Sequence, residues 1–129
     1  MFLFAAALLL LASASASAQS TLDIPVGLRG GAASVSVTIH ENPDAHPGAA
    51  TVLAVHGFTE NADTWAPLTE AMFMHRRTRR HVKRVIALDL PGHGNSDRPV
   101  VGPEAVHNMH YTDPVGIIEA AFGVPHVFF

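Results

Sequence analysis

Two short segments hold the residues whose types and spacing could do chemistry. His56-Gly57-Phe58 directly follows the apolar run Thr51–Val55, and Asp89-Leu-Pro-Gly-His-Gly-x-Ser96 directly follows Val85–Leu88. A glycine lets the backbone turn sharply because it has no Cβ. Backbone N–H groups held in such a turn can stabilise negative charge on a substrate oxygen. Taken alone, His56-Gly57 is better explained as a strand-ending turn with a structural histidine, because a single glycine is ordinary turn chemistry.

The second segment is first of all explained by turn chemistry. Gly92 and Gly94 permit a tight backbone path and Pro91 fixes it, while Asp89 and His93 are expected to satisfy local hydrogen bonds. We therefore predict a structural loop after a buried strand.

Strands and helices must position these loops. Apolar or alternating runs predict strands, and glycines around positions 27, 30 and 31 predict a turn between the first two strands. Residues 41–49 are rich in proline, glycine and other turn residues, which predicts a connector. Helices are expected between the later strands, which predicts an α/β fold with a mostly parallel sheet and flanking helices. The predicted strands are Leu22–Val26, Ser34–Ile39, Thr51–Val55, Val85–Leu88 and a last one beginning at His126, and the predicted helices are Thr64–His75 and Asp113–Phe122.

Each predicted helix has recognisable ends. Asn61 and Asp63 are candidate caps of the first, and Pro114 and Gly123 mark the start and stop of the second. The inner side of the first helix is predicted to carry four apolar side chains. These are Trp65, Leu68, Met72 and Met74.

Together, Val52–Trp65 and Val85–Pro99 resemble the α/β-hydrolase superfamily, in particular the branch containing esterases, proline iminopeptidases, epoxide hydrolases and haloalkane dehalogenases. The resemblance implies that the Phe58 N–H is an oxyanion-hole donor and that His56 and Gly57 support it. It also implies that the loop containing Asp89, Gly92, His93 and Gly94 shapes the edge of a substrate pocket. The implied activity of the full-length form is hydrolysis of a small ester-like molecule by a serine nucleophile, without a cofactor.

The nucleophile of such an enzyme lies on a G-x-S-x-G elbow, with an acid and a histidine later in the chain. Gly94-Asn95-Ser96 begins like an elbow, but Asp97 and Arg98 follow, so we reject Ser96 as the nucleophile. We therefore expect the N-terminal portion of an α/β-hydrolase fold, truncated before its elbow, inactive by itself and prone to aggregate along an unpaired strand edge. An aspartate nucleophile in the parent enzyme and a non-catalytic secreted binding or remnant domain remain open alternatives.

The first 18 residues, MFLFAAALLLLASASASA, join a short apolar block to an A-x-A cleavage pattern. They predict a signal peptide cleaved after Ala18, a secreted or periplasmic protein, and a partial hydrolase domain over residues 19–129. The block is shorter than the roughly 20 apolar residues of a membrane-spanning helix, so stable membrane insertion is not expected. The absence of cysteine excludes disulfides and thiolate metal sites.

Two other clusters of side chains could bind a ligand. His107 and His110 could face the same way on a helix, but zinc needs three or four ligands, so no metal site is predicted.

Six of the eight Lys and Arg residues fall between Arg76 and Arg84. This run could bind an anionic surface, although export argues against nucleic acid. The favoured explanation is a solvated helix end whose cations complement the helix dipole.

Overall fold

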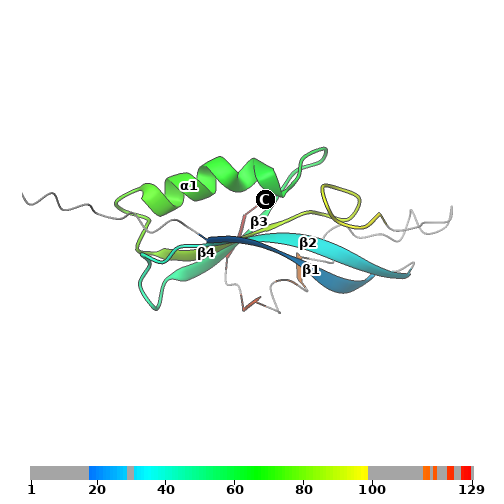
Figure 1. Cartoon of the computed structure of the whole chain (residues 1–129), viewed down its shortest axis with the longest axis horizontal. Helices are drawn as coiled ribbons and strands as arrows, with labels where there is room; N and C mark the ends of the chain where they lie inside the picture. The colour runs from blue at the N-terminus through cyan, green and yellow to red at the C-terminus, as the bar shows by residue number, and fades with distance from the viewer. Residues whose placement is uncertain are drawn as a thin grey trace, which may run out of the picture.

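The computed structural model describes residues 18–28, 31–98, 115, 116, 118, 122, 123 and 126–128. Their strands form one sheet with the order β1-β2-β4-β3-β5, and Figure 1 shows β1 to β4 in one layer with α1 on one side of it. β3 runs parallel to β4 and β5, whereas the β1–β2 and β2–β4 pairs are antiparallel. The strands are β1 (Ala18–Leu28), β2 (Gly31–Glu41), β3 (Ala50–Val55), β4 (Val82–Leu88) and β5 (His126–Phe128), and the helices are the 3-10 helix η1 (Ala62–Trp65) and α1 (Ala66–Met74).

The predicted α/β fold is confirmed, but the sheet is mixed and not mostly parallel, because β1 and β2 form a long antiparallel hairpin at its edge. All the predicted strands exist, and those before residue 90 extend further than their apolar patterns. Gly27 and Gly31 lie within the paired strands and not in the turn, since Leu28 already pairs with Gly31. The predicted 41–49 connector is confirmed apart from Glu41, which ends β2.

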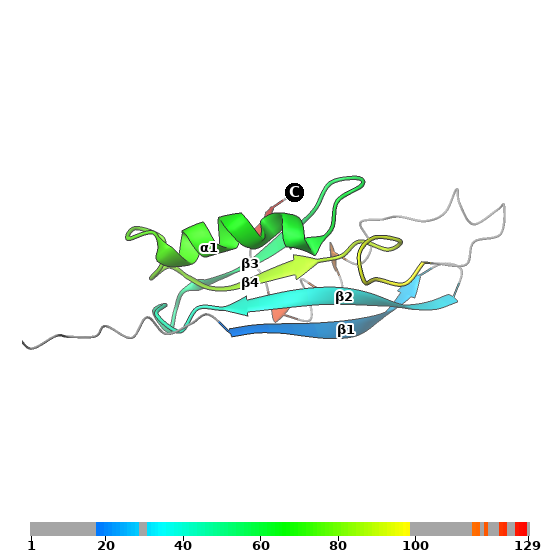
Figure 2. The same cartoon turned by 45° about the horizontal axis from the view of Figure 1, so that its top comes forward.

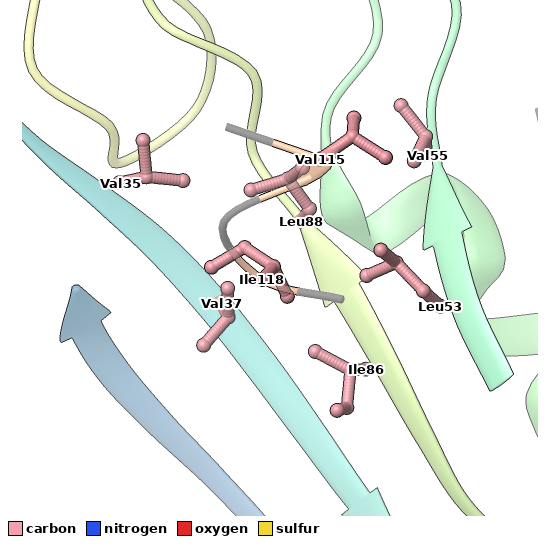
Figure 3. Packing of buried hydrophobic residues seen from close by; sticks show 8 residues of the cluster. All are labelled: Val35, Val37, Leu53, Val55, Ile86, Leu88, Val115 and Ile118. Carbon is pink, nitrogen blue, oxygen red and sulfur yellow. The ribbon is translucent and has the colours of Figure 1, made fainter. Parts of the chain in front are cut away.

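One face of the sheet carries the larger apolar core. Because side chains alternate along a strand, the odd-numbered valines of β2 and the even-numbered residues of β4 reach the same face. There they pack against Val115 and Ile118, which lie in a helical stretch (Figure 3). The buried cluster is Val35, Val37, Leu53, Val55, Ile86, Leu88, Val115 and Ile118.

The opposite face packs against η1 and α1 (Figure 2). The buried residues of this second cluster are small, namely Val52, Ala54, Val85 and Ala87 of the strands and Ala62 of η1, and Trp65, Met72 and Phe73 of the helices pack against them. The predicted inner positions Trp65 and Met72 are confirmed. Leu68 and Met74 were predicted wrongly, because their side chains are 48% and 72% exposed. Thr69, which is 3% exposed, lies on the inner side instead.

The ends of the predicted helices are partly confirmed. Asn61 caps η1 by accepting a hydrogen bond from the Asp63 N–H at 2.9 Å, so Asp63 is a first-turn residue and not the cap. α1 ends at Met74, and His75 is extended. Residues 115, 116, 118 and 122 are helical and Gly123 has a φ of 61°, while the rest of the predicted 113–122 helix lies outside the described residues.

The predicted signal peptide lies almost wholly outside the described residues, which begin at Ala18. Within the part of the chain that is described, no helix is long and apolar enough to span a membrane.

Candidate functional site

A tight turn follows β3 and presents Phe58. The Glu60 N–H donates to the Gly57 carbonyl at 3.2 Å, and the Gly57 N–H donates to the Glu60 carboxylate at 3.1 Å. Thr59, the third residue of the turn, has a φ of 70°, a left-handed conformation that usually selects glycine. The Phe58 N–H is not used by the turn, and among the described residues no group accepts a hydrogen bond from it. The Phe58 side chain is 86% exposed.

His56 connects this turn to the loop after β4. Its ring is buried at 3% exposure. The Leu90 N–H points to Nε2 at 2.9 Å, and since a backbone N–H can only donate, Nε2 is the acceptor. The ring proton is therefore on Nδ1, which donates to the Gly57 carbonyl at 2.7 Å. A neutral imidazole in this one tautomer thus fixes the position of the turn.

The ring of His93, in the loop after β4, contacts the end of β3 and the turn that follows it. Its ring centroid is 5.1 Å from that of His56 and 6.0 Å from that of Phe58, with an edge-to-face arrangement against Phe58. The ring also lies within hydrogen-bonding distance of its own loop, with Nδ1 3.1 Å from the Pro91 carbonyl. The three rings therefore pack the end of β3 against the loop after β4.

Asp89 holds the other side of that loop. Its buried carboxylate accepts from the Ala62 N–H at 2.6 Å and from the Asn95 N–H at 2.9 Å. One oxygen therefore satisfies a backbone donor at the start of η1, and the other closes the loop. Charge-assisted bonds of this kind are roughly twice as strong as neutral ones.

Gly94 packs directly against this carboxylate. A Cβ at Gly94 would overlap the Asp89 side-chain oxygens, and the φ of 49° is unfavourable for any residue with a Cβ. Gly92 has a φ of 79° but open space around it. Gly94 is therefore required for both space and conformation, whereas Gly92 is required for conformation alone.

Ser96 is buried, with 8% of its surface exposed, and its hydroxyl is hydrogen-bonded within the protein. Its hydroxyl donates to the Asp89 carbonyl at 2.5 Å and accepts from the Ser36 N–H at 2.8 Å. The Asp89 N–H donates to the Ser36 carbonyl at 2.9 Å. The Asp97 N–H donates to the Ser34 carbonyl at 3.0 Å, and the Asp97 carboxylate accepts from the Ser34 N–H at 2.8 Å. The loop thus continues the β2 ladder beyond the end of β4.

A polar cavity of about 190 Å³ opens beneath the loop. His56 and Phe58 do not line it, so it is distinct from the turn. Its walls are Thr38, Asn61, Ala62, Asp63, Asp89, Gly94 and Asn95. His40 lies on β2, the strand that contributes Thr38 to this cavity. Burial lowers the pKa of His40 below its ordinary 6.5, and the Asp63 carboxylate partly opposes this lowering.

The structure brings the predicted residues together, because His56, Phe58 and His93 are in ring contact and Leu90 joins His56 to the Asp89 loop. Glu60 and the two serines of β2, Ser34 and Ser36, were not predicted from the sequence. A carboxylate four residues after a strand-ending histidine is a weak signal for Glu60. The pairing of Ser36 with Ser96 has no local signal, because it spans 60 residues.

His107 and His110 lie outside the described residues. Within the described part, no three His, Asp or Glu side chains are grouped closely enough to hold a metal ion.

Comparison with known proteins gave one family and several structures. A family model described as the alpha/beta hydrolase fold matches residues 50–129. A mutant haloalkane dehalogenase, DatA from Agrobacterium tumefaciens C58, is similar with a TM-score of 0.53 and 20% identity, over 81% of this chain and 29% of that one. A membrane phospholipase A described as a bacterial virulence factor has a TM-score of 0.35 and 25% identity, over 75% and 29%. No curated protein matches.

Proposed function

The chain belongs to the α/β-hydrolase fold family, and on that premise we propose that the Phe58 N–H is one donor of an oxyanion hole in a hydrolase of ester or related acyl bonds. The supporting observation is the Phe58 N–H itself, which has no acceptor among the described residues and stands in a turn fixed by His56 and Glu60. Such a donor stabilises the oxyanion of a tetrahedral intermediate without reorganising during the reaction.

The other residues of the site have supporting roles in this proposal. His56 and Gly57 set the direction of the Phe58 N–H, and the loop with Asp89, Gly92, His93 and Gly94 forms the adjacent pocket edge. A small ester-like molecule is the proposed substrate. The 129 residues contain no G-x-S-x-G elbow, so the reaction needs a nucleophile that they do not supply. The chain spans 29% of the length of the similar dehalogenase.

The proposal is tested first on the chain itself with p-nitrophenyl acetate and butyrate, while light scattering monitors aggregation. No turnover is expected from a soluble sample, because the nucleophile is missing. Turnover that is lost in Phe58→Pro and kept in Phe58→Ala would show instead that the chain contains an unrecognised nucleophile.

The second test uses a longer protein in which these residues are joined to a segment that contains a G-x-S-x-G nucleophile elbow. Phe58→Pro removes the N–H and should lower kcat by about 10²–10³-fold. Phe58→Ala keeps the N–H and is the matched control, and circular dichroism checks that both variants fold. An unchanged kcat in Phe58→Pro would refute the oxyanion role. Halide release from haloalkanes without ester turnover would indicate an aspartate nucleophile in place of serine.

We also propose that residues 1–18 are a cleaved export signal. β1 begins at Ala18, so cleavage after this residue would remove only the first position of the β1–β2 ladder. Mass spectrometry of the protein recovered from the medium or periplasm should give Gln19 as the first residue. Recovery of the uncleaved chain in the cytoplasm would contradict the proposal.

A further inference from the structure

The connection between α1 and β4, residues 75–81, is rich in cations, and we call it the arginine turn. Arg76, Arg77, Arg79 and Arg80 all have exposed side chains. Because β3 and β4 are parallel, the connection leading into β4 lies at the opposite end of the sheet from the turn that follows β3. Figure 2 shows these two connections at opposite ends. The arginine turn is thus remote from Phe58.

The backbone of the arginine turn is held from inside the protein. The buried side chain of Asn42 donates to the carbonyls of Arg79 and Val82 at 2.6 and 2.7 Å. The His46 N–H donates to the Arg80 carbonyl at 3.0 Å, and the Thr78 hydroxyl donates to the Met72 carbonyl at 2.7 Å. The arginines therefore project from an ordered backbone, and a partner would have to order only their side chains.

The charge of the turn exceeds what the fold requires. Arg84, at the end of the basic run, is paired with Glu41 at 2.6 Å. The carbonyl end of a helix carries only about half an elementary negative charge. Four neighbouring guanidinium groups far outweigh this charge, and they repel one another. An anionic partner would relieve that repulsion.

An apolar side chain stands beside these cations. Met74, the last residue of α1, is 72% exposed and precedes Arg76 by two positions. At a lipid surface, a methionine can enter the acyl boundary while guanidinium groups meet the phosphates. A nucleic acid would match the arginines but would leave Met74 in water. The combination therefore favours a lipid surface.

We propose that the arginine turn and Met74 form a peripheral docking surface for bilayers that contain anionic phospholipid. This surface is separate from the proposed hydrolase site, since the two lie at opposite ends of the sheet. Docking through it leaves the Phe58 turn directed away from the bilayer.

The test is co-sedimentation of the mature chain, which begins at Gln19 and lacks the apolar leader, with phosphatidylcholine vesicles, with or without one third phosphatidylglycerol, at low and high salt. Binding is expected only with phosphatidylglycerol and should weaken as salt screens the charges. Each cation near an anionic surface contributes a factor of about five in affinity, so replacing Arg76, Arg77, Arg79 and Arg80 together by Gln should weaken binding by about 10²–10³-fold. Replacing the same four by Lys, or Arg98 alone by Gln, should leave binding nearly unchanged.

Met74→Ser distinguishes a lipid partner from a polyanion. This variant should bind anionic vesicles about five-fold more weakly, because it loses apolar burial, and should be retained on heparin as the parent chain is. Equal binding to both kinds of vesicle, full binding by the four-Gln variant, or unchanged vesicle binding by Met74→Ser would each overturn the proposal. Tighter binding to duplex DNA than to vesicles would assign the turn to nucleic acid instead.

Discussion

At the scale of single residues, Gly92 and Gly94 allow the cost of a left-handed conformation to be compared with the cost of a steric overlap within one loop. Both have positive φ, but only Gly94 faces a carboxylate at the position of its missing Cβ. Gly92→Ala should cost about 1–2 kcal/mol, the usual penalty for a left-handed residue with a Cβ. Gly94→Ala should cost more, because it must also displace Asp89. Urea unfolding of both variants checks this, and equal costs would show that the Asp89 contact does not resist displacement.

His40 predicts how stability depends on pH. Burial lowers its pKa in the folded protein below 6.5, so the unfolded chain binds more protons between the two pKa values. Stability from neutral His40 is therefore complete above pH 6.5 and decreases as the pH falls toward the folded pKa. His40→Gln should flatten the decline in Tm over this window. Asp63→Asn should deepen it, because Asp63 raises the pKa of His40, and an unchanged profile in both variants would contradict this assignment.

At the scale of elements, Ser96 predicts how firmly the loop is joined to β2. Ser96→Ala removes two hydrogen bonds and leaves the Ser36 N–H without its partner. An unpaired buried donor costs about 1–3 kcal/mol, and this loss should appear as a lower urea midpoint with an unchanged m-value. Asn95→Ala is the matched control, since Asn95 uses its backbone N–H in the network. A loss of similar size in the control would refute the specific role of the Ser96 hydroxyl.

The strands were predictable from sequence and the helix face was not. Alternation in Ser34–Ile39 and the apolar run Thr51–Val55 each reflect a buried strand, so their existence followed directly. Strand ends were missed, since β1 and β2 continue to pair beyond the hydrophobic patterns that predicted them. α1 is apolar on several sides, so Leu68 and Met74 could not be separated from Met72 by pattern alone.

The candidate site was predictable only where its chemistry is local. His56-Gly57 after a strand predicts a turn, and the structure has a tight turn from Gly57 to Glu60. The left-handed φ of Thr59 and the carboxylate of Glu60 on the Gly57 N–H depend on the folded turn and have no residue signature. The tautomer of His56 follows from the Leu90 N–H, which is brought near only by tertiary structure.

At the scale of the whole molecule, the sheet separates two apolar clusters. Val37→Ala and Val52→Ala each create a cavity costing about 2 kcal/mol on opposite faces, and their costs should add. Val37→Ala combined with Leu88→Ala should deviate from additivity, because these residues are cross-strand partners in one cluster. Chemical denaturation of the single and double variants provides the measurement. Strong coupling between Val37 and Val52 would show that the two faces are one cooperative core.

The Asp89 carboxylate has a consequence for motion. It joins the amide of Ala62 at the start of η1 to the amide of Asn95 in the loop after β4, so neither segment can move far without releasing a charged hydrogen bond. These two amides should therefore exchange with deuterium through one shared opening event, with equal opening free energies. The 3-10 helix and the loop after β4 would then open slowly as one unit, because a single side chain links them.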